Sequence, residues 1–178
     1  MKFSIFNFQF SNRGFTIFFA VLVTSLALAI GLSIYDLTVR ELQLSGVANQ
    51  SQYAIYAADT GAECALYWDT HCNASSCVAG SAFATSTFAG ATANSALNCI
   101  GADITNTSAP TSWSITQNVG TQSATTTFTV SFSPQPYCAT VTVAKVGNPA
   151  QTTIVSHGYN TCAAGGVTRL ERALQVSY

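Results

Sequence analysis

Cysteine is the residue type whose number and placement in this sequence point most clearly to a defined chemistry. Six cysteines occur, all C-terminal to a long apolar segment: Cys64, Cys72, Cys77, Cys99, Cys138 and Cys162. An even number confined to one side of such a segment is typical of disulfides formed in an oxidising compartment. A zinc site would need C-x-x-C pairs, and no two cysteines here have that spacing. We therefore expect disulfides and no bound metal.

The pairing of the cysteines is left open by the sequence, because six cysteines can be connected in many ways. Two pairs are predicted. Cys72 and Cys77 would close a small loop, and Cys138 and Cys162 would link two strands.

Catalytic chemistry has little support in the sequence. His71 and His157 are the two histidines, and the many serines make any Ser-His-Asp match uninformative. The motifs G-x-S-x-G, H-E-x-x-H, G-x-G-x-x-G and the P-loop do not occur. We expect no catalytic residue, no cofactor and no enzymatic activity. Four aromatic residues that could offer stacking surfaces are expected to fill the core instead: Trp68, Trp113, Tyr137 and Tyr159.

The content of charged residues in this chain is unusually low for a soluble domain. Only 7% of its 178 residues are charged, while 48% are hydrophobic, and soluble domains usually carry about 25% charged residues. The six basic and seven acidic residues form no run or stripe. A nucleic-acid partner is therefore not indicated.

An apolar segment runs from Phe15 to Ile34 without a charged residue. Its length of about twenty residues spans roughly 30 Å as a helix, the thickness of a bilayer core. Lys2 and Arg13 precede it and Asp36 follows it, which predicts a cytoplasmic N-terminus and an exported remainder. A cleaved secretory signal peptide would have a shorter apolar region.

Helical periodicity continues beyond the apolar segment. We predict one helix from about Phe15 to about Trp68, apolar on all sides over 15–35 and amphipathic over 36–68. Gly31, Gly46 and Gly61 weaken the helix without ending it. Apolar or small residues recur at helical spacing in this second part: Leu37, Leu44, Val47, Ala54, Ala58, Ala62 and Ala65.

The remaining sequence predicts a loop region followed by a sheet. We predict that residues 69–111 form a disulfide-braced loop region with one short strand or helix. Residues 112–178 are predicted to form an antiparallel sheet. Phe128, Val130 and Phe132 alternate with polar residues and would face the helix. The predicted strands are Ser112–Val119, Ala124–Ser133, Tyr137–Val146, Gln151–His157 and Leu170–Tyr178. The fold class is therefore α+β, with a long N-terminal helix packed on an antiparallel sheet.

The start of the apolar segment resembles the processing site of type IV prepilins, through the junction Ser11-Asn12-Arg13-Gly14-Phe15-Thr16-Ile17. The tract from Tyr56 to Glu63 is similar to the Ala-rich helix of minor pilins. The resemblance implies a leader of residues 1–14, cleavage between Gly14 and Phe15, and methylation of the new N-terminal Phe15. It also implies the lollipop-shaped fold of pilins.

The sequence departs from the family at the fifth mature position, where most pilins carry glutamate and this chain carries Phe19. In the family that glutamate is thought to pair with the terminal amine of a neighbouring subunit. A buried ammonium without a partner costs several kcal/mol. The departure resembles minor pilins and the tip pseudopilin of type II secretion. The alternative is a filament that dispenses with the pair.

The resemblance implies a structural subunit of a type IV pilus-like filament (a fimbrium), most like a minor pilin. Its expected partners are other pilin subunits in a homo- or hetero-oligomeric filament, the prepilin peptidase, the inner-membrane assembly platform, and the membrane before assembly. It would start in the cytoplasmic membrane and end in an extracellular filament. Two alternatives remain open: a pseudopilin of a type II secretion system, and a signal-anchored surface adhesin or receptor.

Overall fold

A computed structural model describes residues 14–72, 77, 80–107, 112–163 and 169–178. The predicted leader lies outside these residues, apart from Gly14. The chain divides into two compact units, Met1–Gly46 and Val47–Tyr178. Each unit is described by itself.

Helix α1 comprises Gly14–Thr70, so the prediction of one uninterrupted helix is confirmed. A helix tolerates glycine at a cost of about 1 kcal/mol relative to alanine, and α1 continues through Gly31, Gly46 and Gly61. The last turn is followed at once by two capping hydrogen bonds. The backbone N–H of His71 donates to the carbonyl of Tyr67 at 2.8 Å, and that of Ala82 donates to the carbonyl of Trp68 at 3.0 Å.

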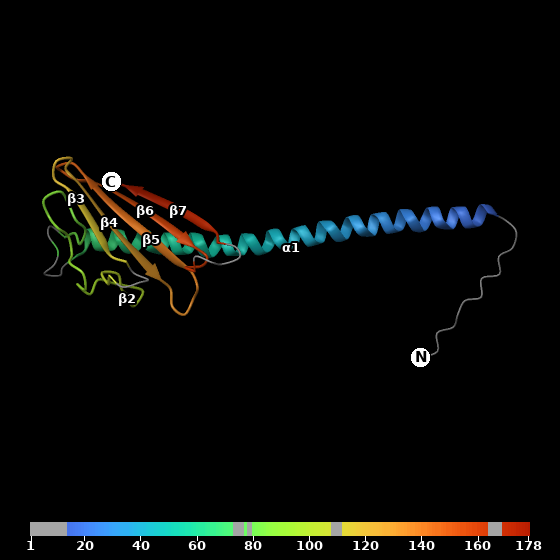
Figure 1. The fold of residues 1–178 in the computed structure, drawn as a ribbon, viewed down its shortest axis with the longest axis horizontal. Helices are drawn as coiled ribbons and strands as arrows, with labels where there is room; N and C mark the ends of the chain where they lie inside the picture. The colour runs from blue at the N-terminus through green and yellow to red at the C-terminus, as the bar shows by residue number, and fades with distance from the viewer. Residues whose placement is uncertain (1–13, 73–76, 78–79, 108–111, 164–168) are drawn as a thin grey trace. The chain divides into compact units, whose positions relative to one another are not determined.

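Five strands form one antiparallel sheet in the order β3-β4-β5-β6-β7, which is the predicted meander. Each strand lies within two residues of its predicted range: β3 Ser114–Asn118, β4 Ser123–Ser131, β5 Cys138–Val146, β6 Gln151–Tyr159 and β7 Glu171–Ser177. The predicted fold class, a helix packed on an antiparallel sheet, is therefore correct. Figure 1 shows the strands side by side next to α1.

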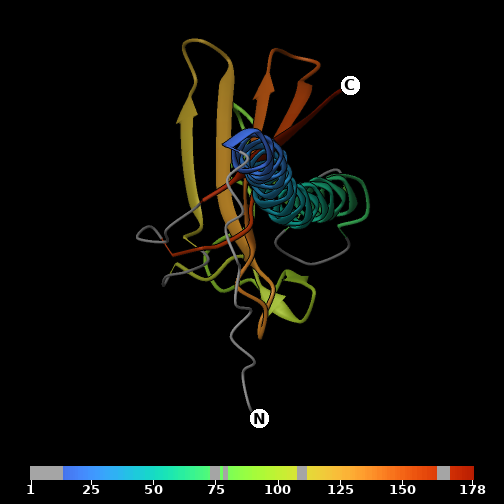
Figure 2. The ribbon, with the colours of Figure 1, turned by 90° about the vertical axis from the view of Figure 1, so that its right-hand side faces the viewer.

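Apolar and polar residues alternate along the strands, and this alternation decides which face of the sheet is buried. In β4, Phe128 and Val130 are fully buried while Thr127 and Thr129 are half-buried, because successive side chains of a strand point to opposite faces. Register keeps the apolar residues together, since Phe128 lies opposite Val141 in β5. The helix covers only one face of the sheet (Figure 1 and Figure 2). The other face carries several threonines, among them Thr125, Thr127 and Thr142.

Small residues let the C-terminal turns of α1 approach the sheet closely. They share one side of the helix at spacings of three or four residues and are all buried: Ala54, Ala58, Gly61, Ala62 and Ala65. Gly158 of β6 lies directly against this side. A Cβ at Gly158 would meet the carbonyl oxygen of Ala54 and the backbone nitrogen of Ala58. Backbone-to-backbone packing therefore sets the helix–sheet distance.

The amphipathic part of α1 is buried only toward its C-terminal end. Leu37, Leu44 and Val47 are 61%, 69% and 44% exposed. Buried positions begin only at Ala54, because within the second unit the sheet covers α1 from this part onward.

The region between helix and sheet contains more structure than one short element. Strands β1 (Asn98–Cys99) and β2 (Ala102–Asp103) form a small antiparallel hairpin. Phe83 from the same region is fully buried, with its ring centroid 6.1 Å from that of Trp113 and 5.8 Å from that of Phe128. Trp113 thus lies in the core, as expected. Residues 73–76, 78–79 and 108–111 of the predicted loop region lie outside the described residues.

Candidate functional site: an exposed apolar helix on a braced domain

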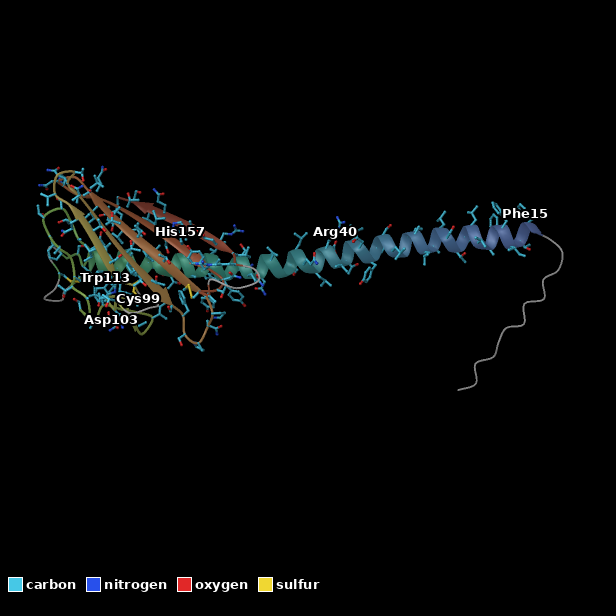
Figure 3. All side chains as sticks on the ribbon, in the orientation of Figure 1. Phe15, Arg40, Cys99, Asp103, Trp113 and His157 are labelled. Carbon is cyan, nitrogen blue, oxygen red and sulfur yellow. A yellow bond between two sulfur atoms is a disulfide. The ribbon has the colours of Figure 1, made fainter. Side chains whose placement is uncertain are left out.

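The N-terminal part of α1 presents apolar side chains on every side. Within Phe15–Ile34 the large apolar residues are between 44% and 76% exposed, and Figure 3 shows their side chains projecting from the helix around the labelled Phe15. A helix that is apolar all round must be buried in lipid or among other helices. This segment therefore requires a partner that the described residues do not supply.

Three hydroxyl groups within this segment donate hydrogen bonds to carbonyl groups of the helix itself. Thr24 donates to the carbonyl of Ala20 at 2.9 Å, and Ser33 donates to that of Ala29 at 2.9 Å. Ser25 donates in the same way to Leu22 at 2.9 Å. Because unsatisfied polar groups are costly in an apolar medium, these bonds make the segment suitable for burial.

By length and hydropathy, α1 is the one helix among the described residues that is apolar enough to cross a membrane, with a mean hydropathy of 2.5 in its most apolar window. The expectation of an apolar N-terminal helix that can serve as a membrane anchor is therefore met.

The beginning of α1 holds the predicted processing site. Phe15 and Phe19 lie one helical turn apart, with ring centroids 6.3 Å apart, and are 76% and 57% exposed. The first turn contains no acidic residue. The first carboxylate of the helix belongs to Asp36, which pairs with Arg40 at 3.1 Å. An amine created at Phe15 would find no carboxylate within the neighbouring turns of its own helix.

Three disulfides brace the second unit: Cys64–Cys99, Cys72–Cys77 and Cys138–Cys162. The two predicted pairs are both present, but Cys162 lies beyond the end of β6, so its disulfide links β5 to a loop and not to a second strand. Cys64–Cys99 joins α1 to the β1–β2 hairpin and was not assigned from the sequence. All six cysteines are paired.

A buried ion pair connects the end of α1 to the sheet. The carboxylate of Asp69 lies 2.5 Å from the Nζ of Lys145 in β5, with side chains 3% and 8% exposed. Asp69 also accepts hydrogen bonds from Ser81, from Thr152 at 3.3 Å and from the phenol of Tyr178 at 2.6 Å. Charged groups are tolerated inside a protein when paired and hydrogen-bonded.

The surroundings of Asp69 shift two pKa values. Burial alone would raise the pKa of Asp69, but hydrogen bonds from Lys145, Ser81 and Tyr178, with the charge of Lys145, outweigh burial and lower it. Burial raises the pKa of Tyr178, and its hydrogen bond to the Asp69 carboxylate raises it further. Asp69 therefore stays ionised and Tyr178 stays protonated.

Sequence reasoning missed this network, although one signal for it exists. Val141, Val143 and Lys145 alternate along β5 and share the buried face. A lysine at the next position of an apolar alternation would need a buried carboxylate. Nothing in the sequence says that Asp69 supplies it.

The two histidines lie in different surroundings. His157 in β6 is 2.5 Å from Glu171 of β7. His71 follows the end of α1, where its ring stacks on Tyr67 and its Nδ1 lies 2.7 Å from the Thr70 hydroxyl. Among the described residues no group of three or more His, Cys, Asp or Glu side chains is arranged to hold a metal ion.

Fold and site together define an α+β protein with a disulfide-braced sheet domain and an exposed apolar helix that is long enough to cross a membrane. Comparison with protein-family models, curated proteins and solved structures found no match. The function of this chain must therefore be argued from its own residues.

Proposed function

We propose that this chain is a minor subunit of a type IV pilus-like extracellular filament. It is synthesised as a precursor with a leader of residues 1–14, waits in the cytoplasmic membrane, and joins the filament through its N-terminal helix. The observation that carries this proposal is the segment Phe15–Ile34, exposed on all sides. It begins directly after the Arg13-Gly14 junction that resembles a prepilin processing site.

The proposal gives each part of the chain a role. The apolar helix has two successive environments, lipid before assembly and the helices of other subunits afterwards. The disulfides suit an exported domain in an oxidising compartment. The prepilin peptidase and the inner-membrane assembly platform are the partners that processing and extraction require. No enzymatic role is proposed.

The N-terminal residue of the purified protein tests the proposal. Cleavage after Gly14 removes 14 of 178 residues and leaves 164, beginning with N-methylated Phe15. Replacing Gly14 with valine should block cleavage, because the peptidase must accommodate the residue before the cut. Intact-mass spectrometry of both proteins, purified from membranes and filaments, measures the change directly.

Gly31→Val is the matched control, since Gly31 lies in the same helix and a Cβ added there would have nothing within 4 Å. This variant should be processed normally. If the unaltered protein retained Met1 and were never found in filaments, the alternative of a signal-anchored adhesin or receptor would replace the proposal. A pseudopilin of a type II secretion system shares the processing, and the length of the assembled fibre would separate it from a pilus subunit.

A further inference from the structure

A cleft of about 260 Å³ lies between the C-terminal turns of α1 and the β1–β2 hairpin, within the second unit. The Cys64–Cys99 disulfide connects its two walls. The side chains that matter for its chemistry are Glu63, Tyr67, Trp68 and Ile100.

The walls of the cleft are mainly apolar and open to solvent. Tyr67 is 55% exposed, and Trp68 contacts it edge-on with ring centroids 5.2 Å apart. The indole Nε1 of Trp68 donates to the carbonyl of Asn98 at 3.2 Å. This bond, together with the disulfide, holds the helix wall against the hairpin wall. The cleft is therefore braced from both sides.

Ile100 has an unusual conformation for its residue type. Its φ of 52°, followed by 78° at Gly101, gives the hairpin two consecutive left-handed residues. Turns of this kind favour Asn, Asp or Gly at the first position, and a β-branched residue is strained there. The side chain of Ile100 is also 56% exposed, so burial within the chain does not offset the strain. An apolar contact between Ile100 and another molecule would offset the strain.

Glu63 adds a carboxylate to these apolar walls. It is exposed, and it forms no ion pair with any residue that the structure describes. Aromatic faces attract guanidinium groups, and a carboxylate binds them through paired hydrogen bonds. An arginine side chain satisfies both features, because its alkyl stem packs on apolar surface while its charged end reaches the carboxylate.

The same unit carries two arginines with complementary properties near the start of β7. The guanidinium of Arg169 lies 3.9 Å from the ring centroid of Tyr159, and Nε of Arg172 donates to the hydroxyl of Ser51 at 2.8 Å. Both arginines are exposed, and neither pairs with a described carboxylate. We refer to Arg169 and Arg172 as the basic edge, and Glu171 between them already lies 2.5 Å from His157.

We propose that the cleft of one copy receives the basic edge of a second copy of this chain. Ser51 and Glu63 are separated by about 18 Å along α1, at the standard helical rise, so the two surfaces lie at different levels of the domain. A contact between two unlike surfaces joins two copies head to tail. The inference rests on the proposed function.

Self-association of the full-length protein in detergent micelles tests the contact, because detergent covers the apolar helix. Sedimentation should show concentration-dependent association, and Glu63→Arg should weaken it roughly tenfold through like-charge repulsion. Asp59→Arg is the control, since Asp59 lies on the same helix, is exposed, does not line the cleft and gives the same change in net charge. Combining Glu63→Arg with Arg169→Glu and Arg172→Glu should restore association.

Cross-linking gives a second measurement that does not depend on a disruptive variant. Arg169→Lys and Arg172→Lys keep the charge and provide an amine that a carbodiimide can join to Glu63. A mixture of nitrogen-14 and nitrogen-15 protein distinguishes cross-links between copies from those within one copy. Mixed-isotope peptides containing Glu63 and an introduced lysine are expected.

Three results would overturn the contact: a wild-type protein that stays monomeric, association unaffected by Glu63→Arg, or cross-links found only within one copy. Each of these leaves the processing experiment at Gly14 untouched. Retention of Met1 would instead contradict the filament proposal, whatever the self-association shows.

Discussion

Asp69 shows how a single residue connects the helix to the sheet. All four of its partners lie far along the chain or in other elements: Ser81, Lys145, Thr152 and Tyr178. Removing one partner from a buried ion pair is strongly destabilising, because the remaining charge loses its compensation. The network therefore makes the final turn of α1 dependent on the sheet and on Tyr178.

Replacing Lys145 with methionine should lower the free energy of unfolding by about 3 kcal/mol at neutral pH. Arg40→Met is the comparison. It breaks the Asp36–Arg40 pair, whose side chains are 65% and 71% exposed, and exposed pairs contribute little. Thermal unfolding of the full chain in detergent, followed by near-ultraviolet circular dichroism, measures both. Equal losses in the two variants would contradict the importance of burial.

The loss of stability in the Lys145→Met variant should also depend on pH. Because the native pKa of Asp69 is lowered, its contribution is complete above the ordinary carboxyl pKa of about 4 and is lost as the pH falls through the lower native value. Without Lys145, the pKa of Asp69 is higher than in the wild type, because the hydrogen bond and the charge of Lys145 no longer lower it. Acid therefore costs the variant less stability than it costs the wild type. The difference between wild type and variant should therefore shrink as the pH is lowered toward 4.

At the scale of elements, helix α1 has two parts with opposite requirements. Its N-terminal part needs large exposed side chains that other helices or lipid can cover. Its C-terminal part carries alanine and glycine on the side that faces the sheet, where Gly158 approaches the helix backbone. Glycine in the same helix therefore has different effects at different positions.

Gly61→Ala and Gly46→Ala should change stability in opposite directions. At Gly61 a Cβ would lie 2.6 Å from the Ser156 hydroxyl and 2.9 Å from Cγ2 of Val141, so we expect a loss of about 1–2 kcal/mol from overpacking. At Gly46 nothing lies within 4 Å, and alanine should add up to about 1 kcal/mol through helix propensity. Thermal unfolding measures both, and changes of the same sign would show that the helix–sheet spacing is adaptable.

At the scale of the whole molecule, Phe19 bears on the place that the chain would take in the proposed filament. A subunit without a carboxylate there cannot neutralise the amine of the subunit above it, and an unpaired buried ammonium costs several kcal/mol. Only a subunit with no neighbour above it avoids this cost. We infer that the chain is used sparingly, at or near the filament tip.

Quantitative mass spectrometry of purified filaments should find far fewer copies of this chain than of the bulk subunit. Phe19→Glu should increase the number of copies incorporated, because each added subunit then supplies a partner for the next amine. Phe18→Glu, one position away on the same exposed helix, is the control and should not increase it. A filament built mainly of the unaltered chain would contradict this position and favour filaments that dispense with the pair.

Local patterns in the sequence determined much of this protein. Uniform apolarity over Phe15–Ile34, helical spacing to Trp68 and alternation after Ser112 predicted the helix and all five strands of the sheet, because each pattern reflects contacts made by every residue of one element. Two of the three disulfides were predicted. The processing site and the presence of Phe19 where most pilins carry glutamate also come from the sequence alone. The processing site and the role inferred from Phe19 stay predictions.

Tertiary structure decided which of these elements and residues meet. It placed the start of the buried helix face at Ala54, joined Cys64 to Cys99, and brought Asp69 to Lys145. It also formed the cleft beside Tyr67 from a helix and a hairpin. The periodicity of apolar residues indicates only whether a side chain is buried. It does not indicate which distant residue packs against that side chain, because this partner is fixed by the packing of the whole domain.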